Sequence, residues 1–229
     1  MFFEKIYPFL DSYHQRRIVN YLSKFKINYF IDVGAHKGEF LNHILKIKCK
    51  KIYCFEPQKK IFTILKSKYK NNKKVELFNI GLADKNSKKI LNVNKLTLTS
   101  TFSKSKNTLY GKLKNFVLNS KDSYVDKYSV RTKKIDEIFF KKKIENIFLK
   151  IDVEGFELNV LKGSKKTLEN KVNFVLVEKQ FYQLYHDNSP DKVDLYLKKN
   201  KFRLLKKFTF PLLHFQDNLY VRENLFKEA

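Results

Sequence analysis

The chain is poor in the residues that interrupt or cross-link small folds. Its 229 residues include two cysteines, four prolines, six glycines and no tryptophan. So few cysteines exclude a disulfide scaffold and a four-cysteine zinc site. The scarcity of glycine and proline excludes collagen-like and low-complexity chains. No apolar run approaches the roughly 18 residues that a transmembrane helix needs.

Two further features indicate a cellular compartment. The first ten residues, MFFEKIYPFL, lack the uninterrupted apolar stretch of a signal peptide. Cys54 lies in the apolar run 52–55 and is interpreted as a small buried hydrophobe rather than a disulfide partner. A reduced, cytoplasmic protein without a transmembrane segment is therefore expected.

Apolar residues, in contrast, are plentiful. Hydrophobic residues make up 43% of the chain and aromatic residues 15%, which excludes an intrinsically disordered protein. At roughly 150 residues per domain the length allows one large domain or two small ones. We expect a single domain over 1–229, in which residues 1–28 form a helical lead-in.

The net charge of +25 is almost entirely due to lysine, because arginine occurs only at positions 16, 17, 131, 203 and 222. Such an excess can indicate a nucleic-acid or anionic-membrane partner. However, the lysine pairs are scattered and form no stripe at helical spacing. Abundant Lys, Asn, Ile, Phe and Tyr are typical of AT-rich coding. The charge is interpreted as compositional background, and no specific nucleic-acid partner is expected.

Short apolar runs alternate with amphipathic segments along most of the chain. Strands are expected over 29–33, 52–55, 75–80, 147–151 and 174–177, followed by an antiparallel pair at 202–208 and 219–221. Helices are expected between them, the first capped by Asp11 and a later one running from Phe156 through Leu168. This alternation predicts an α/β fold with a mostly parallel sheet and helices on both faces.

One stretch, 91–143, breaks that alternation. It is rich in Lys, Ser, Asn and Thr, and the only strand expected there lies near 128–132. We interpret it as an insertion over the sheet rather than as a second domain.

The first expected strand ends in the sequence IDVGAHKGE, residues 31–39. Gly34 permits a tight turn, and Gly38 lets the following helix pack closely. The pattern is D-x-G-x-x-x-G rather than the G-x-G-x-x-G of dinucleotide sites, and Ala35-His36 departs from that form. Asp32 suits a cofactor with a cationic amino group. Asp32, Gly34, Ala35 and Gly38 are therefore predicted to bind S-adenosylmethionine, a cofactor of that kind.

Two more strand ends add candidate cofactor contacts. Glu56 stands 22 positions after Gly34 and can hold both hydroxyls of a ribose. Pro57 suits the first turn of the next helix and belongs to the same predicted site. Gly81 and Asp84 follow the third expected strand, where they would either face an adenine or form a hairpin turn over 83–86.

The fourth strand end, LKIDVEGFE at 149–157, crowds Lys150, Asp152 and Glu154 together. Buried charges are costly unless they are used or paired. If the strand stays extended, alternation puts both acids on one side. We predict that Asp152 and Glu154 act as catalytic base or acceptor-positioning acid and that Asp152 also meets the cofactor. His36 is the alternative base. The structural alternative pairs Lys150 with Glu154 or Glu178. No group has zinc-ligand spacing, so no metal is expected.

These segments resemble the FkbM family of S-adenosylmethionine-dependent methyltransferases. The resemblance rests on FIDVGAHKGEF, IYCFEP, NIGLAD, VRTKKIDEI and, most specifically, LKIDVEGFELNVLKG. It implies a seven-stranded class I methyltransferase fold, Rossmann-like, and O-methyl transfer to a hydroxyl of a sugar, glycan or secondary metabolite.

The resemblance leaves the acceptor open. The regions after Leu91 and after Asn200 match poorly, and an acceptor would bind there, so the small molecule or glycan stays unnamed. The alternatives are a nucleic-acid methyltransferase and a catalytically silent cofactor-binding module. The chain has no Asn/Asp-Pro-Pro-Tyr motif for base methylation, and the intact Asp32, Glu56 and Asp152 disfavour a silent module.

Overall fold

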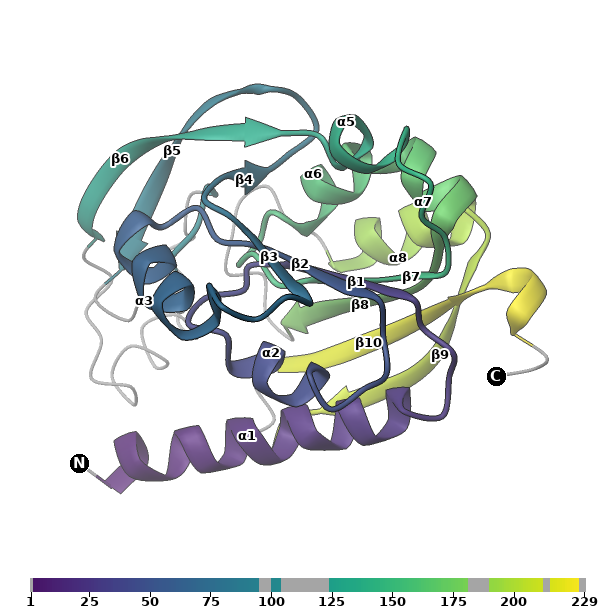
Figure 1. The fold of residues 1–229 in the computed structure, drawn as a ribbon, viewed down its shortest axis with the longest axis horizontal. Helices are drawn as coiled ribbons and strands as arrows, with labels where there is room; N and C mark the ends of the chain where they lie inside the picture. Colours follow the sequence, from purple (N-terminus) through teal and green to yellow (C-terminus); the bar gives the residue numbers. More distant parts are fainter. Residues whose placement is uncertain (1, 95–99, 104–123, 181–189, 212–214, 227–229) are drawn as a thin grey trace.

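A seven-stranded sheet occupies the centre of the molecule (Figure 1). The computed structural model describes residues 2–94, 100–103, 124–180, 190–211 and 215–226. The strand order is β3-β2-β1-β7-β8-β10-β9, in which β10 runs antiparallel to both neighbours and β1, β2, β3, β7 and β8 are mutually parallel. The bounds are β1 Tyr29–Val33, β2 Lys51–Phe55, β3 Val75–Phe78, β7 Ile147–Ile151, β8 Val172–Gln180, β9 Phe202–Thr209 and β10 Phe215–Arg222. The predicted fold class and the closing antiparallel pair are confirmed.

Helices cover both faces of this sheet (Figure 1). One face carries α1 (Phe2–Leu22), α2 (Glu39–Ile44) and α3 (Lys59–Tyr69), and the other carries α5 (Ile135–Phe139), α6 (Glu157–Lys162), α7 (Lys165–Lys171) and α8 (Pro190–Lys199). A short 3₁₀ turn, η2 (Glu223–Leu225), follows β10. Successive residues of β1 point to opposite faces of the sheet. Phe30 packs in the core on the α1 side, and Ile31 packs in the core on the α6 side. This double burial explains why the strands are apolar throughout.

The break in the alternation corresponds to a second, three-stranded sheet. Its order is β4-β6-β5, with β4 Gly81–Leu82, β5 Ser87–Asn94 and β6 Tyr124–Lys133. Its buried apolar core is small and comprises Leu91, Val93 and Val130. Most positions of these strands can therefore stay polar, which explains why this stretch is rich in Lys, Ser, Asn and Thr. Residues 95–99 and 104–123 of the predicted insertion lie outside the described residues, and a single domain with an insertion stays a prediction.

Several predicted boundaries are wrong. The strands expected at 174–177 and 219–221 span Val172–Gln180 and Phe215–Arg222. The third strand ends at Phe78 instead of residue 80, because Gly81 already pairs with β6. Asp11 caps no helix, because α1 begins at Phe2, runs through Pro8 and is anchored by the buried Ile18, Val19 and Leu22. The helix predicted from 156 to 168 is two helices separated at Gly163 and Ser164. Of the helices in the described ranges, none is long and apolar enough to cross a membrane.

Candidate functional site

The carboxyl ends of β1, β2 and β7 meet around a turn at Gly34. The backbone N–H groups of Gly34 and Ala35 both donate to the Phe55 carbonyl at 3.0 Å. Gly34, His36 and Gly38 have φ values of +84°, +47° and +86°. A β-carbon on Gly34 would lie 1.9 Å from the carbonyl oxygen of Asp152. The turn is therefore wedged against the end of β7, as close as glycine allows.

Lys150 links two carboxylates beneath this turn. Its ammonium nitrogen lies 3.0 Å from Asp152 Oδ2 and 3.4 Å from Asp32 Oδ1. Burial alone would lower the pKa of Lys150, but the two carboxylates raise it, so the ammonium stays charged. Burial raises the pKa of Asp32, which is only 1% exposed, and Lys150 opposes that rise.

This pairing changes two expectations. Lys150 does not pair with Glu154 or Glu178 but with Asp152 and Asp32. Asp32 is absent from the walls of the two cavities described below. Its position indicates that it holds Lys150 and Asp152 in place, and direct contact with a cofactor stays a prediction.

The two predicted acids lie on the connection between β7 and α6. The expected strand alternation is wrong, because β7 ends at Ile151 and Glu154 and Gly155 have positive φ values of +50° and +90°. Both acids nevertheless line the same cavities. Glu154 accepts a 2.7 Å hydrogen bond from the Gln180 side chain, and its own carbonyl accepts one from Thr101 at 2.5 Å.

Glu157, just beyond this connection, was not predicted as part of the site. Its carboxylate accepts the Gly155 N–H at 2.9 Å, and burial raises its pKa to about 7. Ser103 donates to the Gly155 carbonyl at 2.9 Å. The turn that carries Asp152 and Glu154 is thus held from both sides, by α6 and by the segment after β5.

Glu56 follows β2 directly and is buried. Its two carboxylate oxygens accept backbone N–H groups from His36 at 3.0 Å and from Gln58 at 2.7 Å. Burial is the main reason why its pKa is raised to about 7. These two donors fix the carboxylate and leave further lone pairs for a ligand. The geometry suits the predicted grip on a ribose, which stays a prediction.

Two adjoining cavities share the Gly34 turn and the β7–α6 connection. The first, here called the α1 cavity, has about 720 Å³ of free space, part of it open to solvent. The second, the β5 cavity, has about 530 Å³ and includes Glu56 and Pro57. Both are lined by Gly34, His36, Asp152 and Glu154. The two cavities, together called the trough here, lie at the carboxyl ends of β2, β1 and β7.

Gly81 and Asp84 lie away from this trough. Neither lines the α1 cavity or the β5 cavity. Gly81 is buried in β4, where a β-carbon would meet the ring of Phe102, and Asp84 is exposed in the connection to β5. The alternative hairpin is also not formed, because β6 lies between β4 and β5.

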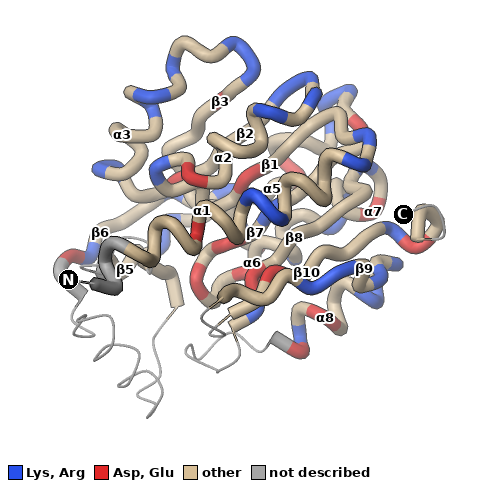
Figure 2. The backbone as a smooth tube through the Cα atoms, turned by 90° about the horizontal axis from the view of Figure 1, so that it is seen from below, with Lys and Arg blue, Asp and Glu red and all other residues tan. Residues whose placement is uncertain are grey.

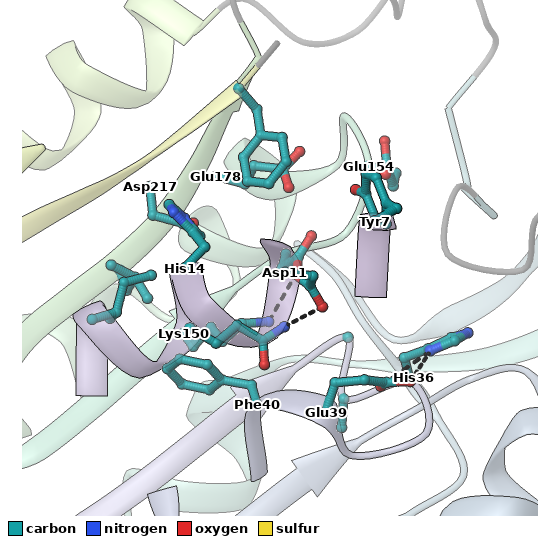
Figure 3. Close-up of a pocket in the computed structure, with 17 residues that line it drawn as sticks. Tyr7, Asp11, His14, His36, Glu39, Phe40, Lys150, Glu154, Glu178 and Asp217 are labelled. Atoms are coloured by element: carbon teal, nitrogen blue, oxygen red, sulfur yellow. Dashed lines mark hydrogen bonds and ion pairs between the residues drawn. The ribbon is translucent and has the colours of Figure 1, made fainter. Parts of the chain in front are cut away.

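The α1 cavity is acidic in a strongly basic protein. Six carboxylates line it, and Figure 3 shows Asp11 of α1 in the middle of the group. They are Asp11, Glu39, Asp152, Glu154, Glu178 and Asp217. Elsewhere Lys and Arg are spread over most of the elements (Figure 2). Burial raises the pKa of Asp11 to about 6, while hydrogen bonding from Gln15 opposes the rise.

Two histidines in this cavity are engaged by carboxylates. His14 Nε2 lies 2.8 Å from Asp217 Oδ2, and His36 Nδ1 lies 3.2 Å from Glu39. Burial of Glu39 favours a higher pKa, but contact with His36 outweighs it and lowers the pKa. His36, the alternative base, is thus already paired within its own turn.

Four residues of the α1 cavity were not predicted as site residues. Asp11, His14, Glu178 and Asp217 come from α1, β8 and β10, and only the fold brings them to one cavity. His14 precedes the buried Ile18 and Leu22 by four and eight positions. That helical spacing would have marked it as a buried polar residue on the inner face of α1.

Comparison with known proteins agrees with this architecture. Residues 32–204 match the family described as Methyltransferase FkbM domain. The structure resembles that of the FkbM methyltransferase from Methylobacillus flagellatus KT, with a TM-score of 0.55 and 16% identity over 85% of this chain. This chain spans only 43% of that protein chain. No functionally curated protein matches the sequence significantly.

Two other solved structures show the same fold. M. capricolum TrmK, in complex with S-adenosyl-homocysteine, has a TM-score of 0.50 and 12% identity, with 90% of this chain and 67% of TrmK covered. Aeropyrum pernix fibrillarin, with S-adenosyl-L-methionine, has a TM-score of 0.53 and 8% identity, with 93% and 76% covered. The family match spans well over half of the 229 residues and includes the Gly34 turn, Glu56 and the β7–α6 connection. The chain therefore belongs to the FkbM methyltransferase family.

Proposed function

We propose that this chain transfers a methyl group from S-adenosylmethionine to a hydroxyl group of a small-molecule or glycan acceptor. The observation that carries the proposal is the trough in which the β5 cavity and the α1 cavity meet at Asp152 and Glu154. One cavity offers Glu56 to a ribose, and the other is the proposed place for an acceptor. The proposal keeps the cytoplasmic location expected from the two free cysteines, Cys49 and Cys54.

The chain's residues fit the cofactor. Glu56 keeps lone pairs for two ribose hydroxyls, and the missing side chain of Gly34 leaves the backbone open to close approach. Asp152 and Glu154, which line both cavities, would offer negative charge to the cationic sulfonium of the cofactor. When bound, S-adenosylmethionine supplies an electrophilic methyl group.

The protein's part in the reaction is alignment and proton removal. Methyl transfer is an in-line displacement, so correct alignment of the acceptor oxygen is worth several kcal/mol. A carboxylate that accepts the hydroxyl proton adds about 10²–10⁴-fold. Asp152 is held by Lys150 and Glu154 by Gln180, so both are fixed at the point where the cavities meet.

The charge of the α1 cavity limits the acceptor class. Six carboxylates against Lys150 and two histidines leave this wall rich in negative charge. Like charges brought together at an interface are costly, so a phosphodiester is a poor occupant. A neutral hydroxyl of a sugar suits this wall better. The nucleic-acid alternative therefore gains no support from the site.

Methyl transfer is tested directly with purified protein. We expect label to pass from methyl-labelled S-adenosylmethionine to a member of a panel of neutral mono- and oligosaccharides, and transfer RNA in the same panel to stay unlabelled. Label on RNA alone would replace the proposed acceptor class with the nucleic-acid alternative.

The acids of the β7–α6 connection are tested with that acceptor. Asp152→Asn and Glu154→Gln should keep the fold and each lower kcat at least about tenfold, because a positioned carboxylate is lost. The matched control is Glu145→Gln, an exposed acid outside both cavities. Wild-type turnover in both site variants would assign the two acids a structural role.

Glu56 makes cofactor binding depend on pH. Ribose hydroxyls donate to the ionised carboxylate, whose pKa is raised to about 7 in the free protein. Binding therefore favours ionisation and releases a proton, so affinity rises as pH rises through that pKa. Affinity for S-adenosylhomocysteine should increase about tenfold from about pH 6 to pH 8. Calorimetry in buffers of different ionisation enthalpy measures both affinity and proton release.

Glu56→Gln provides the control for this prediction. Glu157 and Asp11 also titrate near this range, with pKa values of about 7 and 6. The variant removes only the Glu56 contribution, so its affinity should be lower at pH 8 and nearly flat with pH. If the affinity of the variant depended on pH as steeply as that of the parent, the pH dependence would be assigned to Glu157 or Asp11 instead of Glu56.

A further inference from the structure

We propose that the outer face of α1 docks the protein on an anionic lipid surface. The helix has two distinct sides. Its inner side buries Ile18, Val19 and Leu22 and lines the α1 cavity with residues such as Asp11 and His14. Its outer side carries Phe9, 72% exposed, and Tyr13, 50% exposed. Because they are four residues apart, these aromatic side chains lie next to each other on the helix.

Cations continue this aromatic face. Arg16 and Arg17 are exposed one turn further along, and Lys24 is exposed just after the helix. The guanidinium carbon of Arg17 lies 5.7 Å from the centre of the Tyr13 ring. Among the residues from 6 to 24, whose exposure the structure describes, the exposed set contains no acid, because Asp11 is turned into the α1 cavity.

A second element widens the basic area. Arg17 donates to the Thr209 carbonyl at the end of β9, and the ammonium of Lys206 lies 4.1 Å from the Tyr21 ring centre. Lys206 of β9 is exposed. In Figure 2, which looks onto this side of the molecule, blue segments lie on α1 and along β9.

Lysine-rich composition does not account for this arrangement. The chain has only five arginines, and two of them stand side by side at 16 and 17, directly after the exposed aromatics. Aromatic residues flanked by arginine and lysine on one helix face are typical of helices that lie in the plane of a membrane interface. The net charge of +25 adds long-range attraction to anionic lipid. The same helix walls the α1 cavity, so docking would hold that cavity beside the lipid surface.

Vesicle flotation tests this docking with the full chain. We expect binding to vesicles of phosphatidylcholine with about one third phosphatidylglycerol, and little binding to pure phosphatidylcholine. Phe9→Glu combined with Tyr13→Glu should lower the partition coefficient at least about tenfold. The matched control combines Ile90→Glu with Leu195→Glu, which alters two residues of similar exposure on β5 and α8, and should bind like the parent.

A second pair of variants separates the local face from the overall charge. Arg16→Gln with Arg17→Gln should weaken binding clearly more than Lys165→Gln with Lys166→Gln, an exposed pair on α7. Equal losses would mean that only the net charge matters and would overturn the proposal. Thermal unfolding and S-adenosylhomocysteine affinity, measured on each variant, verify folding independently of any acceptor.

Light scattering decides between lipid and a second copy of the chain. The proposal expects the parent and the Phe9/Tyr13 variant to have the same molar mass in solution. A parent dimer that this variant converts to a monomer would assign the face to self-association and would overturn the lipid proposal.

Discussion

Replacing Lys150 by methionine is expected to destabilise the protein by about 3–5 kcal/mol, because it leaves a buried carboxylate without its cation. The Lys150 ammonium lies within ion-pair distance of Asp32, and the Asp32 side chain is 1% exposed. Methionine keeps most of the length of lysine, so the loss reflects charge more than packing. Urea unfolding, followed by circular dichroism, measures the change in free energy.

The double variant provides the stricter test. Asp32→Asn removes the buried charge, so adding it to Lys150→Met should restore part of the lost stability through a favourable coupling. Lys162→Met, on an exposed position of α6, should change stability by no more than about 0.5 kcal/mol. If the two single losses simply add in the double variant, Asp32 and Lys150 do not form the energetic pair that their 3.4 Å separation indicates.

This ion pair also shows what the sequence could and could not predict about the site. The bounds of β1 and β7 agree with the expected runs 29–33 and 147–151, because both are short apolar stretches bounded by polar residues and glycine. Parallel pairing then had to bring their carboxyl ends together. The partner of Lys150 could not be predicted, since several acids were expected near the same strand end. The register between β1 and β7 determines the partner, because it places Asp32 directly beside Lys150.

The α1 cavity was less predictable for a different reason. Glu178 and Asp217 face each other across the antiparallel pair of β8 and β10, and His14 reaches Asp217 from 203 positions away in the chain. Each lies in an element that contains other polar residues as well, so its residue type alone does not single it out. No short-range spacing connects them, so only the tertiary fold reveals the acidic cavity.

The second large loss of stability is expected for a substitution at Gly34. Gly34→Ala should destabilise the protein by at least about 4 kcal/mol or prevent folding. The φ of +84° already costs an alanine about 1–2 kcal/mol. The added β-carbon would also lie 1.9 Å from the Asp152 carbonyl oxygen, well inside van der Waals contact. That oxygen belongs to the backbone of Asp152, whose N–H donates to the Val33 carbonyl at 3.0 Å. Because this hydrogen bond holds the backbone of Asp152 in place, its carbonyl oxygen cannot move aside easily.

Gly38→Ala is the matched comparison for this prediction. Its φ of +86° is nearly the same, but its β-carbon would meet the ring of Tyr69, 2.5 Å away, and a side chain can shift where backbone cannot. The backbone strain is therefore shared by the two variants, and the difference between them measures the clash with Asp152. We expect Gly38→Ala to remain folded and to lose clearly less stability in urea unfolding. Equal losses would mean that positive φ alone accounts for both glycines, and that the Gly34 turn is not wedged against the acid-bearing end of β7.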